Sequence, residues 1–170
     1  MTKNQIAEGL EKSFEAAVKM TEQSETSHLF RKVDSSWSAA ENMEHLILSV
    51  NPLTFAFRLP KFCLLFFGKP NRPVLTYEEL VKKYLAKLDA GARATSPFVP
   101  KIKYLDKGRL VENFKATNKK FLKSLATWTE GDLDHYLLPH PLLGKLYARE
   151  MLYFTLYHTH HHMRAMEKRL

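Results

Sequence analysis

Apolar residues recur along this chain at intervals of three and four positions, the period of an amphipathic α-helix. In the first such stretch Ile6, Leu10, Phe14 and Val18 share one face, which predicts a helix running to about Gln23. We find no stretch in which apolar and polar residues alternate as a half-buried strand requires. The pattern therefore predicts an all-α protein.

A second helix is predicted to begin just after Trp37. Ser38 and Glu41 stand three positions apart, the spacing of a capping box at a helix start. The apolar face that follows consists of Met43, Leu46, Ile47, Val50 and Leu53. Because Pro52 lacks the N–H group that an α-helix needs, a kink or an interruption is expected there.

A long connection is predicted after this helix. Residues 58–75 carry three prolines around a short apolar run at 62–67, and we expect this crossover to pack on the body of the protein. Thr76 and Glu79 form another capping box, which opens a short extra helix. Its apolar side carries Leu80, Val81, Tyr84 and Leu88.

Two more amphipathic helices complete the pattern. One is predicted from about Lys107 to Thr127, and the last from about Leu146 to near the C-terminus. Between them, residues 130–144 are rich in turn-forming types and predict a loop. The apolar face of the first of these helices contains Leu110, Val111, Phe114, Phe121, Leu122 and Leu125.

Four long helices with one long connection predict a four-helix bundle. The crossover and the short extra helix lie between the second and third bundle helices, so those two can run parallel, which a short loop would forbid. With 170 residues and no sign of a boundary, we expect residues 1–170 to form a single domain.

Composition and charge narrow the function classes. The single cysteine, Cys63, cannot form an internal disulfide, the N-terminus lacks the apolar core of a signal peptide, and no apolar run approaches the ~20 residues of a membrane span. These features predict a cytoplasmic protein with no membrane association. The formal net charge of +8 suggests nucleic-acid binding, but the basic residues are scattered over several helix faces, apart from a stripe at Lys115, Lys119 and Lys123. Nucleic acid is therefore not the expected partner.

Four histidines lie within five residues near the C-terminus: His158, His160, His161 and His162. An affinity tag is one explanation, but the run is interrupted by a threonine and continues into further helical sequence. Each helical residue turns by about 100°, so His158 and His162 differ by about 40° and share an apolar column, whereas the other two point outward. This inward pair could bind a metal ion or could be two core histidines satisfied by hydrogen bonds.

A metal site with only two histidine ligands is weak, so a third ligand is needed. His45 is the best candidate, because it lies beside the apolar face of the second helix, where a neighbouring helix could approach it. A surface position for His45 is the alternative. His28 and His135 are expected in solvent, and His140, which precedes a proline, is expected in a loop or a cap.

Two segments resemble the signatures of the DinB-like superfamily. Residues 37–46 contain its tryptophan, acidic and histidine-leucine pattern, and the segment from His140 through Glu150 to His162 is similar to its distal signature. The resemblance implies a bundle in up-down-down-up order, often dimeric, with a divalent metal ion held by histidines that map onto His45, His158 and His162. Many relatives have a glutamine shortly after the last histidine, where this chain has arginine, alanine and methionine at 164–166.

Three neutral imidazoles would leave one coordination position open for water or substrate. Zinc or nickel is the expected ion, and iron or manganese also fits these ligands. The resemblance then implies a metal-dependent hydrolase or a thiol-dependent transferase acting on an unknown small molecule. A general base is missing: Glu41 is explained by capping, Glu44 by a surface position and Cys63 by a core position. A non-enzymatic binding module with a structural or vestigial metal site is therefore the alternative.

Overall fold

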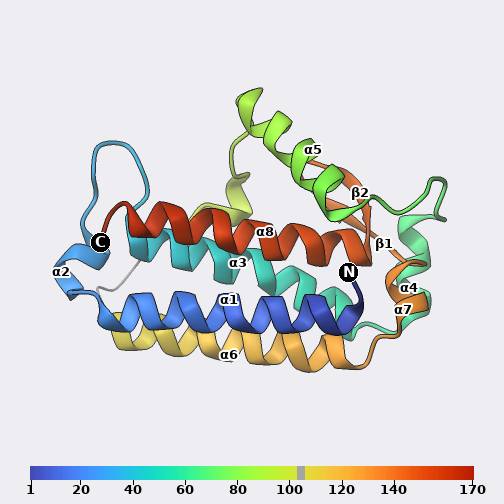
Figure 1. Cartoon of the computed structure of the whole chain (residues 1–170), viewed down its shortest axis with the longest axis horizontal. Coiled ribbons are helices and arrows are strands. Elements are labelled where there is room, and N and C mark those ends of the chain that lie inside the picture. Colours follow the sequence, from blue (N-terminus) through green and yellow to red (C-terminus); the bar gives the residue numbers. More distant parts are fainter. Residues whose placement is uncertain (103–105) are drawn as a thin grey trace.

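The computed structural model describes residues 1–102 and 106–170, and four long helices dominate it. They are α1 (Lys3–Gln23), α3 (Ala39–Arg58), α6 (Lys107–Ala126) and α8 (Ala148–Glu167). Helix α1 packs against α6 and α8, and α3 packs against the same two helices (Figure 1). The predicted all-α helical bundle is confirmed.

The long connection separates α3 from α6. It contains α4 (Lys61–Leu64), the 3-10 turn η1 (Leu65–Phe67), α5 (Tyr77–Asp89) and a second 3-10 turn, η2 (Ser96–Phe98). In Figure 1 the colours of α3 and α6 advance in one direction along the bundle, and those of α1 and α8 advance in the other. Helix α5 lies against α8 on the outside of the bundle.

The helix starts that capping boxes predict are present. Ser38 Oγ accepts a hydrogen bond from the Glu41 backbone N–H while the Glu41 carboxylate accepts one from Ser38 N–H, and Thr76 and Glu79 repeat this arrangement. Each box satisfies donors that the first turn of a helix leaves unpaired, a contribution of about 1 kcal/mol per cap. The first of these caps fixes the residue at which α3 begins, and it therefore also fixes the position of His45 on that helix.

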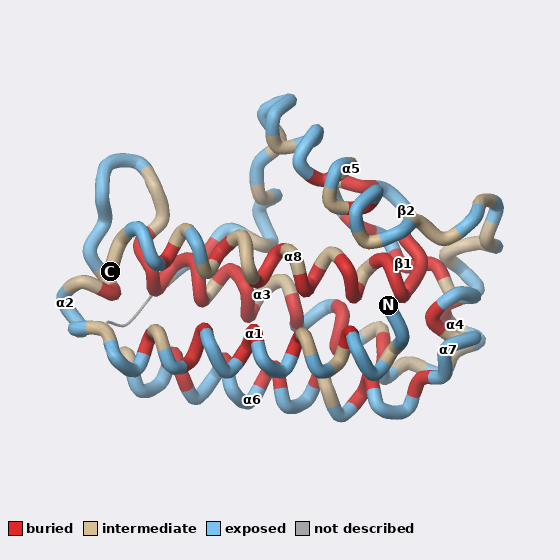
Figure 2. Tube along the Cα trace, in the orientation of Figure 1, coloured by how far each residue is buried: buried red, intermediate tan, exposed pale blue. Residues whose placement is uncertain are grey.

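The core lies between the four long helices, where buried residues line the facing sides (Figure 2). The predicted apolar faces of α1, α3 and α6 are buried, apart from a half-buried Leu122. Phe14 and Phe114 meet edge to face at the α1–α6 contact, with ring centroids 5.9 Å apart. Trp128 stacks on Phe57, and its indole N–H donates to the Phe57 carbonyl oxygen at 2.9 Å.

Of the two outcomes expected at Pro52, a kink or an interruption, the interruption does not occur, because α3 continues through it. A proline removes one helical hydrogen bond, but the residues around it remain held by tertiary packing: Val50, Leu53 and Phe57 are buried. Another short helix, α2 (Thr26–Phe30), lies between the first two predicted helices, where the sequence predicted none. Its single buried residue, Leu29, is too little to produce a periodic pattern.

The segment predicted as a loop forms a small antiparallel hairpin. Strand β1 (Leu137–His140) pairs with β2 (Gly144–Tyr147), with Leu137 opposite Tyr147 and His140 opposite Gly144, and the short helix α7 (Glu130–Leu133) precedes it. The expectation of no strand was wrong because four-residue strands are too short to show a two-residue period. Gly144 has φ +77, a conformation that favours glycine in such a turn.

The apolar run of the crossover packs on the body only in part. Leu64 is fully buried, but Phe62 is 68% exposed and Phe66 is 88% exposed. The crossover is fastened instead by polar contacts, among them an ion pair between Lys61 and Asp132. A four-residue helix can turn only one side chain toward the core, so the rest of the run remains outside.

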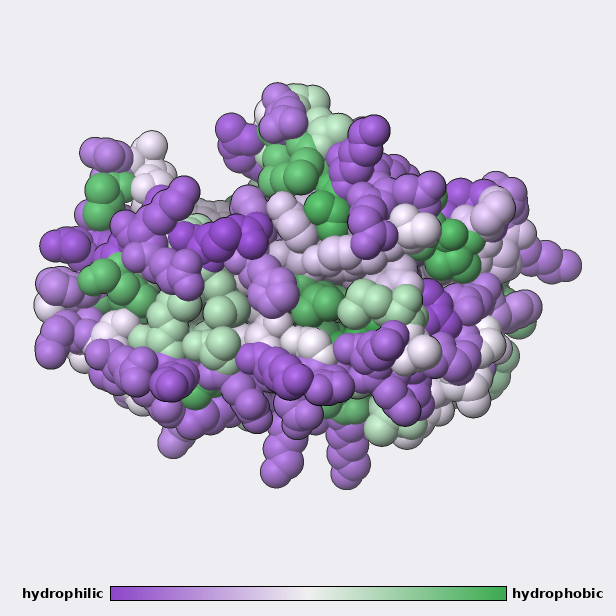
Figure 3. Space-filling model, in the orientation of Figure 1, coloured by the Kyte–Doolittle hydropathy of each residue, from purple (hydrophilic) through white to green (hydrophobic). Residues whose placement is uncertain are grey.

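Most of the face drawn in Figure 3 is hydrophilic, and smaller hydrophobic areas lie over α5 and between the helices. The basic stripe on α6, formed by Lys115, Lys119 and Lys123, is exposed, and Lys115 pairs with Glu22 at 2.7 Å. Among the described residues no single helix is long and apolar enough to cross a membrane. Helix α3 taken together with Lys61–Phe67 passes that test by length and composition only, as a pair bent by 119°.

Candidate metal centre

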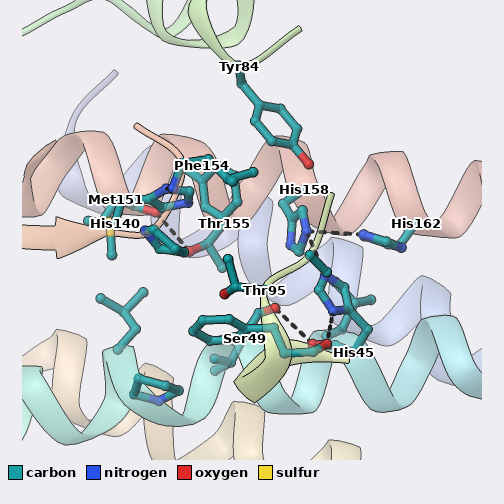
Figure 4. A pocket seen from close by; sticks show the side chains of 18 of the residues that line it. His45, Ser49, Tyr84, Thr95, His140, Met151, Phe154, Thr155, His158 and His162 are labelled. Atoms are coloured by element: carbon teal, nitrogen blue, oxygen red, sulfur yellow. Dashed lines mark hydrogen bonds between the residues drawn. The ribbon is translucent and has the colours of Figure 1, made fainter. Parts of the chain in front are cut away.

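Three histidines from two helices converge inside the bundle. His45 comes from α3, and His158 and His162 lie one turn apart on α8. His158 Nε2 lies 3.1 Å from His45 Nε2 and 3.1 Å from His162 Nε2, and all three side chains are buried (Figure 4). The structure therefore brings together the three residues that the sequence singled out, in a cluster whose ring nitrogens are close enough to hold one metal ion.

Hydrogen bonds on the outer side orient two of the rings. His45 Nδ1 lies 2.6 Å from the carbonyl oxygen of Phe98, and His162 Nδ1 lies 2.7 Å from Asn42 Oδ1. The orientation of the Asn42 amide follows from its NH₂ group, which donates to the carbonyl oxygens of Ser38 and Trp37. Both acceptors require N–H at Nδ1, so the Nε2 atoms of His45 and His162 carry lone pairs.

The lone pairs at the centre of the cluster are not matched by donors. A neutral His158 has one N–H, so at most one proton is available for the three Nε2 atoms. Buried acceptors facing one another at 3.1 Å without enough donors are unfavourable, whereas a cation between them would interact with every lone pair. The donor set thus fits a divalent ion better than it fits hydrogen-bonded core histidines.

Burial keeps these imidazoles neutral. It lowers the pKa of His158 and His162 well below the ordinary value of 6.5, and neighbouring histidines lower both pKa values further. The pKa of His45 is also lowered, mainly by burial, although its hydrogen bond to Phe98 opposes the shift. The neutral, metal-binding form is therefore the one present near pH 7.

Aromatic rings surround the cluster. Trp37 stacks on His162 with ring centroids 6.1 Å apart, and lies 4.9 Å from His45 by the same measure. Phe154 stacks on His158 at 4.7 Å. Tyr84 extends from α5 toward His158 (Figure 4), and burial raises the pKa of its phenol to about 12, so its hydroxyl stays protonated. The tryptophan of the sequence motif thus shields the cluster from one side.

A pocket of about 820 Å³ opens beside the three histidines, and their side chains form part of its wall. It lies between α3 and α8 and is also lined by the hairpin, by α5 and by the segment around η2. Among the described residues that line it there is no aspartate or glutamate. No carboxylate in the described part of the chain is therefore placed to act as a general base there.

Two neighbouring histidines differ from their predicted outward positions. His160 is half-buried, and its Nε2 lies 2.7 Å from the hydroxyl of Ser13 on α1. His161 is half-buried as well and lines the pocket. The helical wheel treated α8 as having one outward side, but α1 covers one flank of α8 and α5 covers another.

The remaining candidates of the sequence lie outside the cluster of three histidines. His140 is buried in the hairpin turn, where its Nδ1 accepts from the N–H groups of Leu142 and Leu143, as expected of a cap. His135 is exposed as predicted, whereas His28 is half-buried. Glu41 caps α3 and pairs with Lys32 at 2.9 Å.

Two further residues, Glu44 and Cys63, differ in burial from what the sequence predicted. Glu44, expected at the surface, is half-buried, and burial raises the pKa of its carboxyl group. Cys63 is half-buried rather than part of the core. Neither residue lines the pocket beside the histidines.

A buried glutamate was missed as a structural residue. Glu150 is fully buried, and its carboxylate accepts two hydrogen bonds from Arg72, at 2.5 and 2.6 Å, and one each from the N–H groups of Leu75 and Tyr147. It thereby ties the crossover to the start of α8, the helix with two of the histidines. Its position three residues after a helix start was the available signal.

The comparison with protein families agrees with this site. The family model of the DinB superfamily matches residues 9–166, nearly the whole chain. The chain belongs to the DinB superfamily. The resemblance noted from the two sequence segments is therefore confirmed, and this member brings both segments together at the histidine cluster. No curated protein and no solved structure matches the chain significantly.

Proposed function

We propose that this DinB superfamily protein binds one divalent metal ion through His45, His158 and His162. The observation that carries the proposal is the convergence of the three Nε2 atoms, two of which have lone pairs imposed by the outer hydrogen bonds to Phe98 and Asn42. Zinc or nickel is the expected ion, and iron or manganese also suits three imidazoles. Such an ion supplies Lewis acidity and lowers the pKa of a coordinated water or thiol.

The proposed activity is metal-dependent hydrolysis or thiol-dependent transfer on a small molecule that enters the pocket. The chain itself contributes three neutral imidazoles, aromatic side chains in the pocket wall, and a protonated Tyr84 hydroxyl that can donate a hydrogen bond into the pocket. The low-dielectric surroundings strengthen each of these electrostatic interactions. The homodimer and the cytoplasmic location expected from the sequence stay predictions, and light scattering of the purified protein tests the first.

Metal analysis of protein purified without a nickel column tests the metal centre. We expect stoichiometric zinc or nickel after titration, and loss of uptake in His158→Ala. His135→Ala is the matched control, because this histidine is exposed and lies outside the pocket. A wild-type protein that takes up no divalent ion would refute the proposal.

The second candidate is a non-enzymatic binding module. It is favoured by the lack of any carboxylate among the described residues of the pocket wall. In that case His158→Ala would abolish metal uptake without changing any turnover of ester, amide or thiol-transfer substrates by the purified protein. Turnover that depends on the added metal would instead support the enzyme.

A further inference from the structure

The residues that line the pocket cover a long stretch of α3, and His45 is the first of them on that helix. Along α3 the pocket wall extends from His45 to Leu59, which at a rise of 1.5 Å per residue corresponds to about 21 Å. In Figure 4 the Tyr84 hydroxyl reaches toward His158, Thr95 lies in the middle of the view, and His140 lies on the side away from the three histidines. A ligand that fills this space is therefore longer than the metal centre alone requires.

Most of the wall away from the histidine cluster is apolar. A polar exception there is His140, whose Nδ1 already accepts two backbone hydrogen bonds. The apolar part includes Val50, Leu53, Leu59, Phe67 and Leu138. A sugar, a peptide or a nucleotide would leave its polar groups without partners against these side chains, which is costly. An alkyl chain loses nothing there and gains from leaving water.

One basic side chain lies in the described part of the wall. Arg93 is exposed and lies five residues before Phe98, whose carbonyl oxygen holds His45. Its Nη1 donates to the neighbouring carbonyl of Ala92, and it forms no ion pair among residues 1–102 and 106–170. Its charge is thus available to an anionic group of a ligand.

We propose that the pocket binds a single-chain amphiphile, with an alkyl chain along the apolar wall and one small anionic head group at the histidine end. The position of the head group rests on the metal centre proposed above, whereas the position of the chain rests on the apolar wall. The volume of about 820 Å³ lies within the usual range for small-molecule sites.

Calorimetric titration of the zinc-loaded protein with straight-chain carboxylates, from butanoate to dodecanoate below their micelle concentrations, tests the inference. Affinity should increase about fourfold for each added methylene, the equivalent of ~0.8 kcal/mol, until the pocket is filled. An affinity that does not change with chain length would overturn the proposal, and this series needs no variant.

A substitution in the pocket wall tests where the alkyl chain of the ligand lies. Ala56 is a half-buried residue of the pocket wall eleven positions beyond His45, so Ala56→Trp should shorten the longest chain that still gains affinity while leaving butanoate unchanged. Ala86→Trp is the control, on an exposed position of α5 outside the pocket. An unchanged length limit in a folded Ala56→Trp protein would place the chain elsewhere and contradict the proposal.

The head group is tested separately. Arg93→Met should weaken every carboxylate by a similar factor and leave the corresponding alcohols unaffected, and equal effects on both series would count against an anionic head. If the protein takes up no metal but its affinity still depends on alkyl-chain length, the proposed metal centre is refuted and the alkyl site is supported. If the protein binds metal but alkyl-chain length has no effect on affinity, the metal centre is supported and the alkyl site is refuted.

Discussion

Asn42 Oδ1 accepts a hydrogen bond from His162 Nδ1 at 2.7 Å, across 120 residues of sequence. Asn42 lies in the first turns of α3, three residues before His45, and its own NH₂ group is held by two carbonyl oxygens at the start of that helix. The cap of α3 thereby sets the orientation of a histidine on α8. The two segments that identify the family are thus coupled by a direct contact.

Removing this contact should weaken metal binding without unfolding the protein. In Asn42→Ala the His162 ring loses the acceptor that keeps its proton on Nδ1, and such outer contacts are typically worth 10–100-fold in metal affinity. Competition with a chromophoric zinc chelator measures the effect. Asn51→Ala, at an exposed position of the same helix, should bind zinc as the wild type does. Equal affinities for both variants would show that Asn42 does not orient the ligand.

The ion pair between Arg72 and Glu150 should be important for stability. Glu150 is fully buried, so Arg72→Met leaves a carboxylate in the interior with only two backbone donors. Because Arg72 is partly exposed, the loss should be somewhat smaller than the roughly 3 kcal/mol of a fully buried pair, and urea denaturation measures it as a lower free energy of unfolding. The double variant with Glu150→Gln should recover part of this loss. Additive effects of the two substitutions would contradict a direct coupling.

His140 should make the metal-free protein less stable in mild acid. Burial, assisted by the charge of Lys83, lowers the pKa of His140 from 6.5 to about 4. Between these values the unfolded chain binds a proton that the folded chain does not, so stability falls as pH decreases from about 6.5 and is unaffected above it. The slope reaches about 1.4 kcal/mol per pH unit for one proton.

The substitution His140→Asn isolates this contribution. An asparagine side chain can still accept from the backbone N–H groups in the turn, but it does not titrate. Urea denaturation at pH 7 and pH 5 should show a smaller loss of stability for the variant than for the wild type. The same loss in both proteins would assign the acid sensitivity to the other buried histidines.

Truncation to alanine should affect the stability of the protein very differently at a buried phenylalanine and at an exposed one. Phe114 is fully buried against Phe14, so Phe114→Ala should cost about 3–5 kcal/mol in the free energy of unfolding. Phe66 is 88% exposed, and Phe66→Ala should change stability by about 0.5 kcal/mol or less. Thermal or urea unfolding of the two variants provides the comparison, and a large effect at Phe66 would reveal a contact that the monomer does not have.

The sequence predicted the elements whose signal is local and repeated. The apolar faces of α1, α3 and α6 and the capping boxes at Ser38 and Thr76 are visible in the chain because each depends on residues three or four positions apart. The hairpin was missed because four-residue strands show no reliable period. The sequence left open whether Pro52 interrupts α3, and the helix continues because packing outweighs one absent hydrogen bond.

The histidine site divides in the same way. By itself the sequence determined that His158 and His162 share one face of a helix, since that depends only on helical geometry. It also offered His45 as the third ligand from its place beside an apolar face, and the motif resemblance agreed with that choice. Only the tertiary structure decided that His160 and His161 are half-buried, that Asn42 and Phe98 fix the tautomers, and that an apolar pocket adjoins the cluster. Those features arise from contacts between distant segments, and no local pattern specifies which segments meet.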